Sequence, residues 1–399
     1  MHVRSTSIRP FVSIALALFS AAFLFLGMSA QTQAASNPRP PHQPWPLQKL
    51  TTISLPGTPR SNWCYDTAVV DDGTYYLADN DRAGIDLIHD GQHPMYQGII
   101  GQGQFSGIGG CKVGNYDTNG PEGLVIVHDQ IFAGDGKSAV RVYDRETGRF
   151  ITAISTRGHL RADEMAYDAR DQLVIVANGS ERSFSKQAAP FLSFISTKKG
   201  PTYDRIVKTL PFPHADALEQ PQWNSENGMI YLTVPSSDQN TTGEVDMINP
   251  ATWTITPIAT PTCEDAGLAF VNRDLAAVGC ASGEQIILNV RTHRIVHIPV
   301  TAVDIVAAST RFLYFASYGS ETQAPQLAVT DLAGHLLQAI PLSRVSHTVT
   351  VDKATGSVYV PLDGGQVEVF QETPCHWRDA RTLSDKTAPP SLKKGAVHA

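Results

Sequence analysis

Ionisable side chains recur at the start of short apolar segments along this chain. Each stands just before or at the head of a run of β-forming residues, as Glu122 does before "GLVIV". The full set is Asp66, Glu122, Asp163, Glu219, Asp304 and His347. Carboxylate oxygens are the ligands that hard cations such as Ca²⁺ or Mg²⁺ prefer, and one imidazole adds a group that can bind Mn²⁺ or transfer a proton. Brought together, these residues could hold a divalent cation.

Three interpretations of this pattern stay open. The acidic residues can accept backbone N–H bonds and keep a channel hydrated, hold a metal ion or cationic ligand, or take part in catalysis. Gathered carboxylates raise one another's pKa, so a cation or bound water must compensate for them. We therefore name Ca²⁺ or another divalent cation as the expected cofactor, with Glu122, Asp163 and Glu219 as its favoured ligands.

The segments that these residues open belong to an internal repeat. The stretch "DEMAYDARDQLVIVAN" from Asp163 matches "HTVTVDKATGSVYVPL" from His347 almost position for position. Five more units follow the same template, and consecutive starts lie from 38 residues (266 to 304) to 56 residues (66 to 122) apart. Radial repeats of about 40–50 residues, with four short strands each, are typical of a β-propeller. We predict an all-β fold, a seven-bladed β-propeller.

The ends of the repeat region predict how this ring closes. The last unit offers three strands, "HTVTV", "GSVYVPL" and "QVEVFQ", while "LQKLTTISL" near the start of the chain resembles an outer strand. An N-terminal outer strand in the last blade would remove two exposed sheet edges. The predicted domains are a signal peptide at 1–35, a Pro-rich linker at 36–46, the propeller at 47–371 and a flexible C-terminal tail at 372–399.

The repeat alignment also places the ionisable residues relative to one another. The first strand of each propeller blade lines the central channel, so equivalent residues form a ring. Six of the seven aligned positions carry the ionisable set, and the seventh is Ala266, with Glu264 and Asp265 just before it. We expect an acidic ring at one channel mouth, and the loops that follow the second strands should lie on the same face.

Two stretches, "VRVYDRETGRFITAIS" and "VDKATGSVYVPL", resemble YVTN-type repeats, in which a D-x-x-T-G-type turn joins the outer strands. This resemblance spans about residues 49–371 and implies the propeller fold. Strands such as "AGLAF" also resemble those of gluconolactonase-like propellers, which place metal ligands at the strand-opening position. Those propellers have six blades and a Glu/Asn/Asp ligand set, whereas this chain has seven units and no Asn at that position. The second resemblance implies an alternative function, a metal-dependent hydrolase or lactonase.

The composition and the N-terminus predict where the protein acts. The chain has 399 residues, 17% of them charged, with a formal net charge of −7, which argues against a nucleic-acid partner. Arg4 and Arg9 precede an apolar run from Phe11 to about Ala30, a pattern typical of a secretory signal peptide, with an uncleaved anchor as the alternative. We expect a periplasmic or secreted monomer, with no membrane contact beyond the signal segment. Its partner would be a small-molecule or protein ligand at the channel mouth.

Export permits disulfides among the five cysteines. Cys263 precedes a first strand and Cys280 ends a second strand of the same unit, so both should lie at the mouth face. Cys64 and Cys111 precede the first strands of adjacent units. We predict a Cys263–Cys280 bridge, a Cys64–Cys111 bridge and a free Cys375, against the alternative that all five are reduced.

The sequence contains no C-x-x-C-H, H-E-x-x-H, P-loop or G-x-S-x-G motif. Two functional hypotheses remain. The first is an exported binding or scaffold propeller with a cation or cationic ligand at its mouth. The second is a metal-dependent hydrolase, in which Asp163, Glu219 or His347 transfers a proton. The hydrolase requires three or four ring residues to converge on one ion, whereas the binding protein tolerates a wide, hydrated ring.

Overall fold

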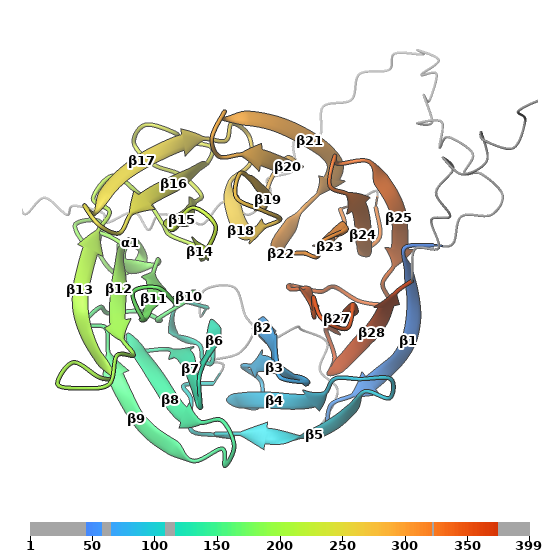
Figure 1. Cartoon of the computed structure of the whole chain (residues 1–399), viewed down its shortest axis with the longest axis horizontal. Helices are drawn as coiled ribbons and strands as arrows, with labels where there is room; N and C mark the ends of the chain where they lie inside the picture. The colour runs from blue at the N-terminus through green and yellow to red at the C-terminus, as the bar shows by residue number, and fades with distance from the viewer. Residues whose placement is uncertain (1–44, 58–64, 108–115, 321–322, 374–399) are drawn as a thin grey trace, which may run out of the picture. The chain divides into compact units, whose positions relative to one another are not determined.

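Seven four-stranded antiparallel sheets stand around a central axis in this protein (Figure 1). The computed structural model describes residues 45–57, 65–107, 116–320 and 323–373. Within each sheet the strands follow one another from the axis outwards, so every sheet is one blade. The predicted all-β, seven-bladed propeller is confirmed.

The first six blades each take four consecutive strands from the chain. Blades 1 to 3 are β2 (Tyr65–Asp71), β3 (Thr74–Asp79), β4 (Gly84–His89) and β5 (Met95–Ile100); β6 (Leu124–Val127), β7 (Gln130–Asp135), β8 (Ala139–Asp144) and β9 (Phe150–Ser155); and β10 (Met165–Asp168), β11 (Leu173–Asn178), β12 (Phe191–Ser196) and β13 (Arg205–Pro211). Blades 4 to 6 are β14 (Pro221–Asn224), β15 (Met229–Val234), β16 (Glu244–Asn249) and β17 (Thr254–Ala259); β18 (Asp265–Phe270), β19 (Leu275–Cys280), β20 (Glu284–Asn289) and β21 (Arg294–Thr301); and β22 (Val303–Ala308), β23 (Phe312–Ser317), β24 (Gln326–Asp331) and β25 (Leu336–Pro341).

Blade 7 combines the two ends of the described chain. It contains β26 (Thr350–Val351), β27 (Ser357–Leu362), β28 (Gln366–Glu372) and, as its outer strand, β1 (Leu47–Ser54). β1 pairs antiparallel with β28, from Leu47 opposite Glu372 to Ser54 opposite Gln366 (Figure 1). The predicted closure of the ring by an N-terminal outer strand is therefore present.

Helical structure is short in the described part of the chain. It comprises a 3₁₀ turn, η1 (Tyr116–Thr118), and a single helical turn, α1 (Glu181–Phe184). Neither could cross a membrane, because no described helix is long and apolar enough to do so.

The hydrophobic core is divided among the contacts between neighbouring blades. The described residues form seven buried clusters, and each draws its side chains from two adjacent sheets. At the closing contact between blades 7 and 1, the rings of Tyr359 and Tyr75 stack with centroids 4.4 Å apart. Successive side chains of the middle strands point to opposite faces of the sheet. Large apolar residues on both faces are therefore buried against the neighbouring blades.

The two D-x-x-T-G-type turns use the same side-chain bonds in different places. In "DRETG", an oxygen of Asp144 accepts the Thr147 hydroxyl at 2.6 Å, and in "DKATG", an oxygen of Asp352 accepts the Thr355 hydroxyl at 2.7 Å. The first turn joins the outer strands β8 and β9, as expected. The second joins the inner strands β26 and β27, where the repeat alignment places it, and in this it departs from the YVTN-type pattern, in which the turn joins outer strands. Gly356 closes the second turn with a φ of 77°, which favours glycine.

Closure by β1 makes Leu47 a sensitive position. Its side chain is 2% exposed in the cluster between blades 6 and 7, whereas Leu50 on the same strand is 42% exposed. We expect Leu47→Ala to lower the free energy of unfolding by about 2–5 kcal/mol, because it leaves a cavity at the closing blade. Leu50→Ala is the matched control, with an expected change within about 0.5 kcal/mol. Urea unfolding of both variants measures this, and equal losses would contradict a core role for the N-terminal strand.

Candidate functional site

The strand-opening residues lie where the inner strands begin, at irregular points of the sheets. In blades 1, 5 and 6, the pairing of the first two strands shifts at this place, as between Tyr65 and Ala68 on β2. A bulge turns the local side chains out of the regular alternation. Asp66 lies inside this irregularity and so is not aligned with the side chains of the regular strand.

Blades 2, 3 and 4 present the position through one common backbone pattern. The N–H of Glu122 donates to Gly134 O at 3.0 Å, that of Asp163 to Ala177 O at 2.8 Å, and that of Glu219 to Thr233 O at 3.0 Å. In each case the same residue of the second strand donates its own N–H to the backbone carbonyl oxygen of the residue that follows the acid. The three acids are therefore structurally equivalent, which is what the repeat alignment predicts.

Three of the predicted residues form a compact group. Asp66, Glu122 and Asp163 each offer a carboxylate oxygen, and these oxygens lie within 4.8 Å of one another. All three residues are buried, with exposures of 4%, 1% and 1%. The group we favoured for a cation was Glu122, Asp163 and Glu219. Glu219 is not in the compact group, and Asp66 from blade 1 takes its place.

His347 connects two further members of the ring. Its Nε2 lies 3.4 Å from Asp66 Oδ1, and its Nδ1 lies 3.3 Å from Asp304 Oδ2. The Tyr318 hydroxyl, from the loop after β23, is 2.7 Å from His347 Nδ1 and 3.0 Å from Asp304 Oδ2. Blades 1, 6 and 7 thus contribute a histidine held between two carboxylates, with a tyrosine beside it.

Arg161 is the largest feature that the sequence analysis missed. Its Nη1 donates to Glu122 Oε2 at 3.2 Å, and its Nε lies 2.7 Å from Asp163 Oδ2 without the alignment of a hydrogen bond. The guanidinium therefore contacts two of the three compact carboxylates. The only available signal was its position two residues before Asp163, and no other repeat has an arginine there.

The loop that carries Arg161 is held by a buried acid. Glu181 of α1 accepts the backbone N–H groups of His159 at 2.8 Å and Leu160 at 3.1 Å, and the N–H of Arg161 donates to Asp117 O at 2.8 Å. The His159 ring also stacks on Phe184, with centroids 3.9 Å apart. These contacts fix the backbone from which the arginine reaches the ring.

Glu164 is a second residue of the site that the sequence analysis did not predict. It follows Asp163, is 3% exposed, and its Oε2 has no hydrogen-bond partner. Asp163 Oδ1 and Asp66 Oδ1 are also buried oxygens without a hydrogen-bond donor, since the nearby His347 ring is not aligned with Asp66. Buried polar atoms in folded proteins usually have a hydrogen-bond partner, so these three oxygens are exceptions to that rule.

Burial dominates the electrostatics of this cluster. Loss of hydration raises the pKa of Glu122, Glu164 and Glu219 well above the usual range, and neighbouring negative charges add to the effect. Burial raises the pKa of Asp163 to about 7, although the charge of Arg161 opposes this rise. Several protons, or a bound cation, must therefore accompany the cluster at neutral pH.

The pKa values of Asp66 and His347 shift in the direction opposite to the one that burial alone would cause. Burial disfavours the Asp66 carboxylate, but the interaction with Glu122 and the positive charge of His347 outweigh burial and lower the pKa of Asp66. Burial likewise disfavours the imidazolium, but the charges of Asp304 and Asp66 raise the pKa of His347. The surroundings at this end of the cluster therefore favour the ionised form of Asp66 and the charged form of His347.

Two adjoining cavities follow the inner strands next to this cluster. Cavities of about 250 and 450 Å³ share Ala68, Gln220 and Trp223 in their walls. The smaller includes Thr67, next to Asp66, and the larger extends to Glu226 and Lys353 in the turns at the opposite end of the first strands. The ring itself is mostly buried, unlike the wide, hydrated opening that the binding hypothesis would tolerate.

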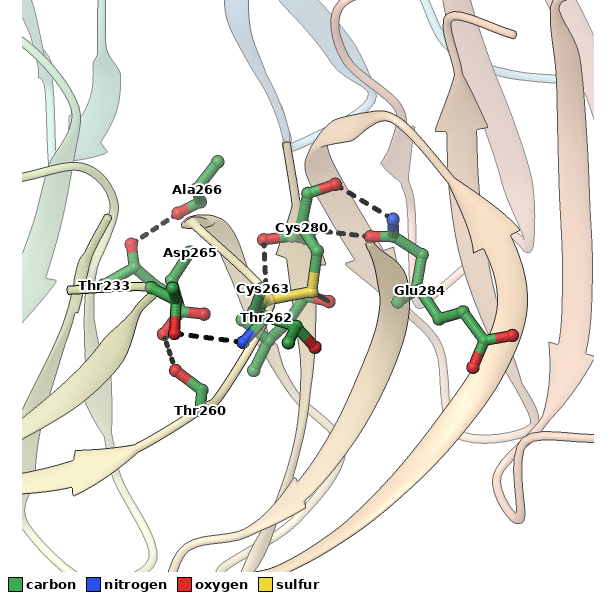
Figure 2. The surroundings of a disulfide bond; sticks show 12 residues. Thr233, Thr260, Thr262, Cys263, Asp265, Ala266, Cys280 and Glu284 are labelled. Carbon is green, nitrogen blue, oxygen red and sulfur yellow. Dashed lines mark hydrogen bonds between the residues drawn. A yellow bond between two sulfur atoms is a disulfide. The ribbon is translucent and has the colours of Figure 1, made fainter. Parts of the chain in front are cut away.

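Blade 5 departs from the ring. Ala266 has no ionisable group, and the preceding Asp265 accepts the Thr260 hydroxyl at 2.6 Å (Figure 2). Burial and then the charge of Glu244 raise the pKa of Asp265, and the same two causes raise the pKa of Asp246 to about 7. These three acids form a separate group between blades 4 and 5.

The disulfide prediction is confirmed for the pair that the structure describes. Cys263, just before β18, is bonded to Cys280, the last residue of β19 (Figure 2). The bond places the start of the first strand and the end of the second at the same face, as inferred for the mouth. Cys64, Cys111 and Cys375 lie outside the described residues, so their pairing stays a prediction.

Comparison with known proteins supports the architecture alone. No protein-family model matches the chain, and no curated protein sequence matches it. Among solved structures, the Pan2 WD40 domain of Neurospora crassa is similar over 82% of this chain and 96% of its own, with a TM-score of 0.57 and 13% identity. A streptogramin B lyase is similar over 82% of this chain and 97% of its own, with a TM-score of 0.58 and 11% identity. The propeller is shown, and membership of the YVTN-type family stays an expectation.

Asp246 provides a test of this buried acidity away from the ring. Its pKa is about 7 in the folded protein and 3.8 in the unfolded chain, so the folded state holds an extra proton between these values. Stability from this group is therefore full below about pH 4 and lost as the pH rises to 7. We expect Asp246→Asn to remove a pH-dependent loss of a few kcal/mol, at about 1.4 kcal/mol per pKa unit.

Urea unfolding at several pH values between 4 and 8 measures this difference. Glu146→Gln, at an exposed carboxyl, is the control and should leave the profile of the wild-type protein unchanged. Parallel profiles for Asp246→Asn and the wild-type protein would show that Asp246 ionises normally in the fold.

Proposed function

We propose that this protein is an exported β-propeller binding protein whose acidic cluster binds a hard divalent cation of the Ca²⁺ class. Asp66, Glu122 and Asp163 are the proposed ligands, because their oxygens already lie within 4.8 Å of one another. The observation that carries the proposal is the set of buried, unpartnered oxygens at Asp66 and Asp163. Export rests on the N-terminal sequence pattern.

The charge balance supports a cation. Five carboxyl groups with shifted pKa values interact here: Asp66, Glu122, Asp163, Glu164 and Glu219. The positive groups that act on them are Arg161, which is permanently charged, and His347, whose charged form is favoured. Oxygen ligands of carboxylate type suit Ca²⁺ or Mg²⁺ better than Zn²⁺. Water in the adjoining cavity would complete the coordination of an ion held by three carboxylates.

Thermal unfolding with CaCl₂ and with EDTA tests the proposal. A ligand that binds only the folded state stabilises it by about 2.7 kcal/mol at a hundredfold excess over Kd, so the melting temperature should rise with Ca²⁺ and fall with chelator. Asp163→Asn should abolish this shift. Asp216→Asn, at an exposed acid outside the cluster, should keep it. The same melting temperature in Ca²⁺, Mg²⁺ and EDTA would refute cation binding.

One observation favours the hydrolase as a second candidate. His347 is 12% exposed beside the proposed ligand Asp66, and Tyr318 and Asp304 both contact its Nδ1 side. A bound divalent cation would polarise a substrate carbonyl. In its deprotonated form, His347 would accept a proton from water on Nε2, while Asp304 stabilises the imidazolium that forms. The similarity to a lyase structure adds only that this architecture can carry a reaction.

Hydrolysis of a panel of lactones and esters in the presence of Ca²⁺ tests this candidate. Loss of the general base should reduce the rate by about 10²–10⁴-fold in His347→Gln. Thermal stabilisation by Ca²⁺ should persist in that variant, since His347 is not a proposed ligand. Rates that are equal in the wild-type protein and His347→Gln would leave binding as the function.

A further inference from the structure

Arg161 occupies the side of the cluster that a bound cation needs. It contacts Glu122 Oε2 at 3.2 Å and Asp163 Oδ2 at 2.7 Å, and both carboxylates are proposed ligands. A divalent cation and the guanidinium cannot both use these oxygens fully. Binding of the ion must therefore weaken the two contacts. The Arg161 side chain is only 17% exposed, so a guanidinium that loses these partners requires another acceptor.

The residue after each ring position has an identifiable structural role in two blades. Thr67, after Asp66, accepts the N–H of Leu124 on its Oγ1 at 3.0 Å. Gln220, after Glu219, accepts the N–H of Leu268 on its Oε1 at 2.6 Å. In both cases the donor is the second residue after the ring position in the next blade. This side chain therefore ties one blade to the next.

Glu164 stands at the same position but has no such donor. The equivalent residue of the next blade is Pro221, which carries no N–H group. Glu164 Oε2 is consequently a buried oxygen without a hydrogen-bond partner, although the side chain is 3% exposed. The blade-to-blade bond that explains Thr67 and Gln220 cannot explain a carboxylate here.

Glu164 also interacts electrostatically with the arginine. Its negative charge acts on Arg161, and in turn the positive charge of Arg161 acts on Glu164. Asp163, which Arg161 contacts, is the neighbouring residue in sequence. A change of side-chain rotamer, with no movement of the backbone that Glu181 holds, is the kind of motion that would transfer the guanidinium.

We propose that Glu164 is a second docking position for Arg161, which a divalent cation displaces from Glu122 and Asp163. The inference rests on the proposed cation site and adds a way in which cation binding at that site is regulated. In the ion-free protein Arg161 takes the place of the cation. In the ion-bound protein it pairs with Glu164. Glu164 is then a positioning residue that acts through Arg161 and not a ligand of the ion.

Calorimetric titration with CaCl₂ of the wild-type protein, Arg161→Gln, Glu164→Gln and the double variant tests this exchange. Removing the competitor should raise the Ca²⁺ affinity by about tenfold or more in Arg161→Gln. Removing the second docking position should lower it by about tenfold in Glu164→Gln, yet by less than about twofold when Arg161 is already Gln. A role of Glu164 as a ligand or distant charge would give the same loss in both backgrounds.

Pro221→Ala provides an independent variant that keeps every charge. It restores an N–H group opposite Glu164, as Leu268 provides for Gln220. The new donor would compete with Arg161, so the Ca²⁺ affinity should fall in the wild-type background and stay unchanged with Arg161→Gln. Thermal unfolding of each variant without Ca²⁺ confirms that the titrated protein is folded.

The outcomes separate this inference from the proposed function. Absence of Ca²⁺ binding in both the wild-type protein and Arg161→Gln would overturn the cation site and the exchange together. Binding in the wild-type protein with no gain in Arg161→Gln would overturn the exchange alone. Equal effects of Glu164→Gln in both backgrounds would likewise remove Glu164 from the exchange and leave the cation site intact.

Discussion

Closure of the ring is the constraint on which the rest of this structure depends. Each blade buries its faces against two neighbours, and the described core consists of seven such contacts. An open ring would expose two of these apolar faces and two sheet edges, so β1 must complete blade 7. The candidate site requires the same closure, because the contact of His347 with Asp66 crosses from blade 7 to blade 1. A site of this kind exists only in the complete circle.

The site also concentrates an electrostatic cost that the blade contacts must offset. Carboxyl groups taken from water favour their neutral form, and their mutual repulsion strengthens this preference. Arg161 and His347 reduce the cost at two points, yet oxygens of Asp66, Asp163 and Glu164 remain without donors. Residues that serve stability alone would pair more completely, as Thr67 and Gln220 do one position away. Thr67, Glu164 and Gln220 share one structural position, and the contrast between them supports the proposal that the cluster binds a ligand.

The sequence was sufficient for the fold because the information is repeated. Seven copies of one pattern allow weak strand signals to be aligned, and the missing outer strand could be found at the other end of the chain. The Cys263–Cys280 bond also followed from strand direction. The joint placement of Asp66, Glu122 and Asp163 followed from the same alignment. A repeat alignment identifies equivalent backbone positions in different blades, and these three residues occupy one such position.

The remainder depends on features that no repeat shares. Arg161 and Tyr318 lie in loops, where the alignment has no counterpart, and their side chains reach the ring only in the folded structure. Glu219 shares the backbone position of Glu122 and Asp163 but is absent from the compact group, which the spacing of residues does not predict. Glu164 was overlooked because its meaning depends on a partner 57 residues further on, Pro221, and on a bond that a proline cannot make.

The closing strand also brings the two ends of the described chain together. Thr373 donates its N–H to Pro46 O at 2.9 Å and its hydroxyl to Trp45 O at 2.7 Å, beside the outer strand of blade 7. Entry and exit therefore form a single seam on the outer edge, on the opposite side of the blade from the channel. Joining these ends directly and opening the chain in a loop elsewhere would preserve every blade contact. For the same reason the propeller is suited to insertion, as one unit, within a loop of another protein.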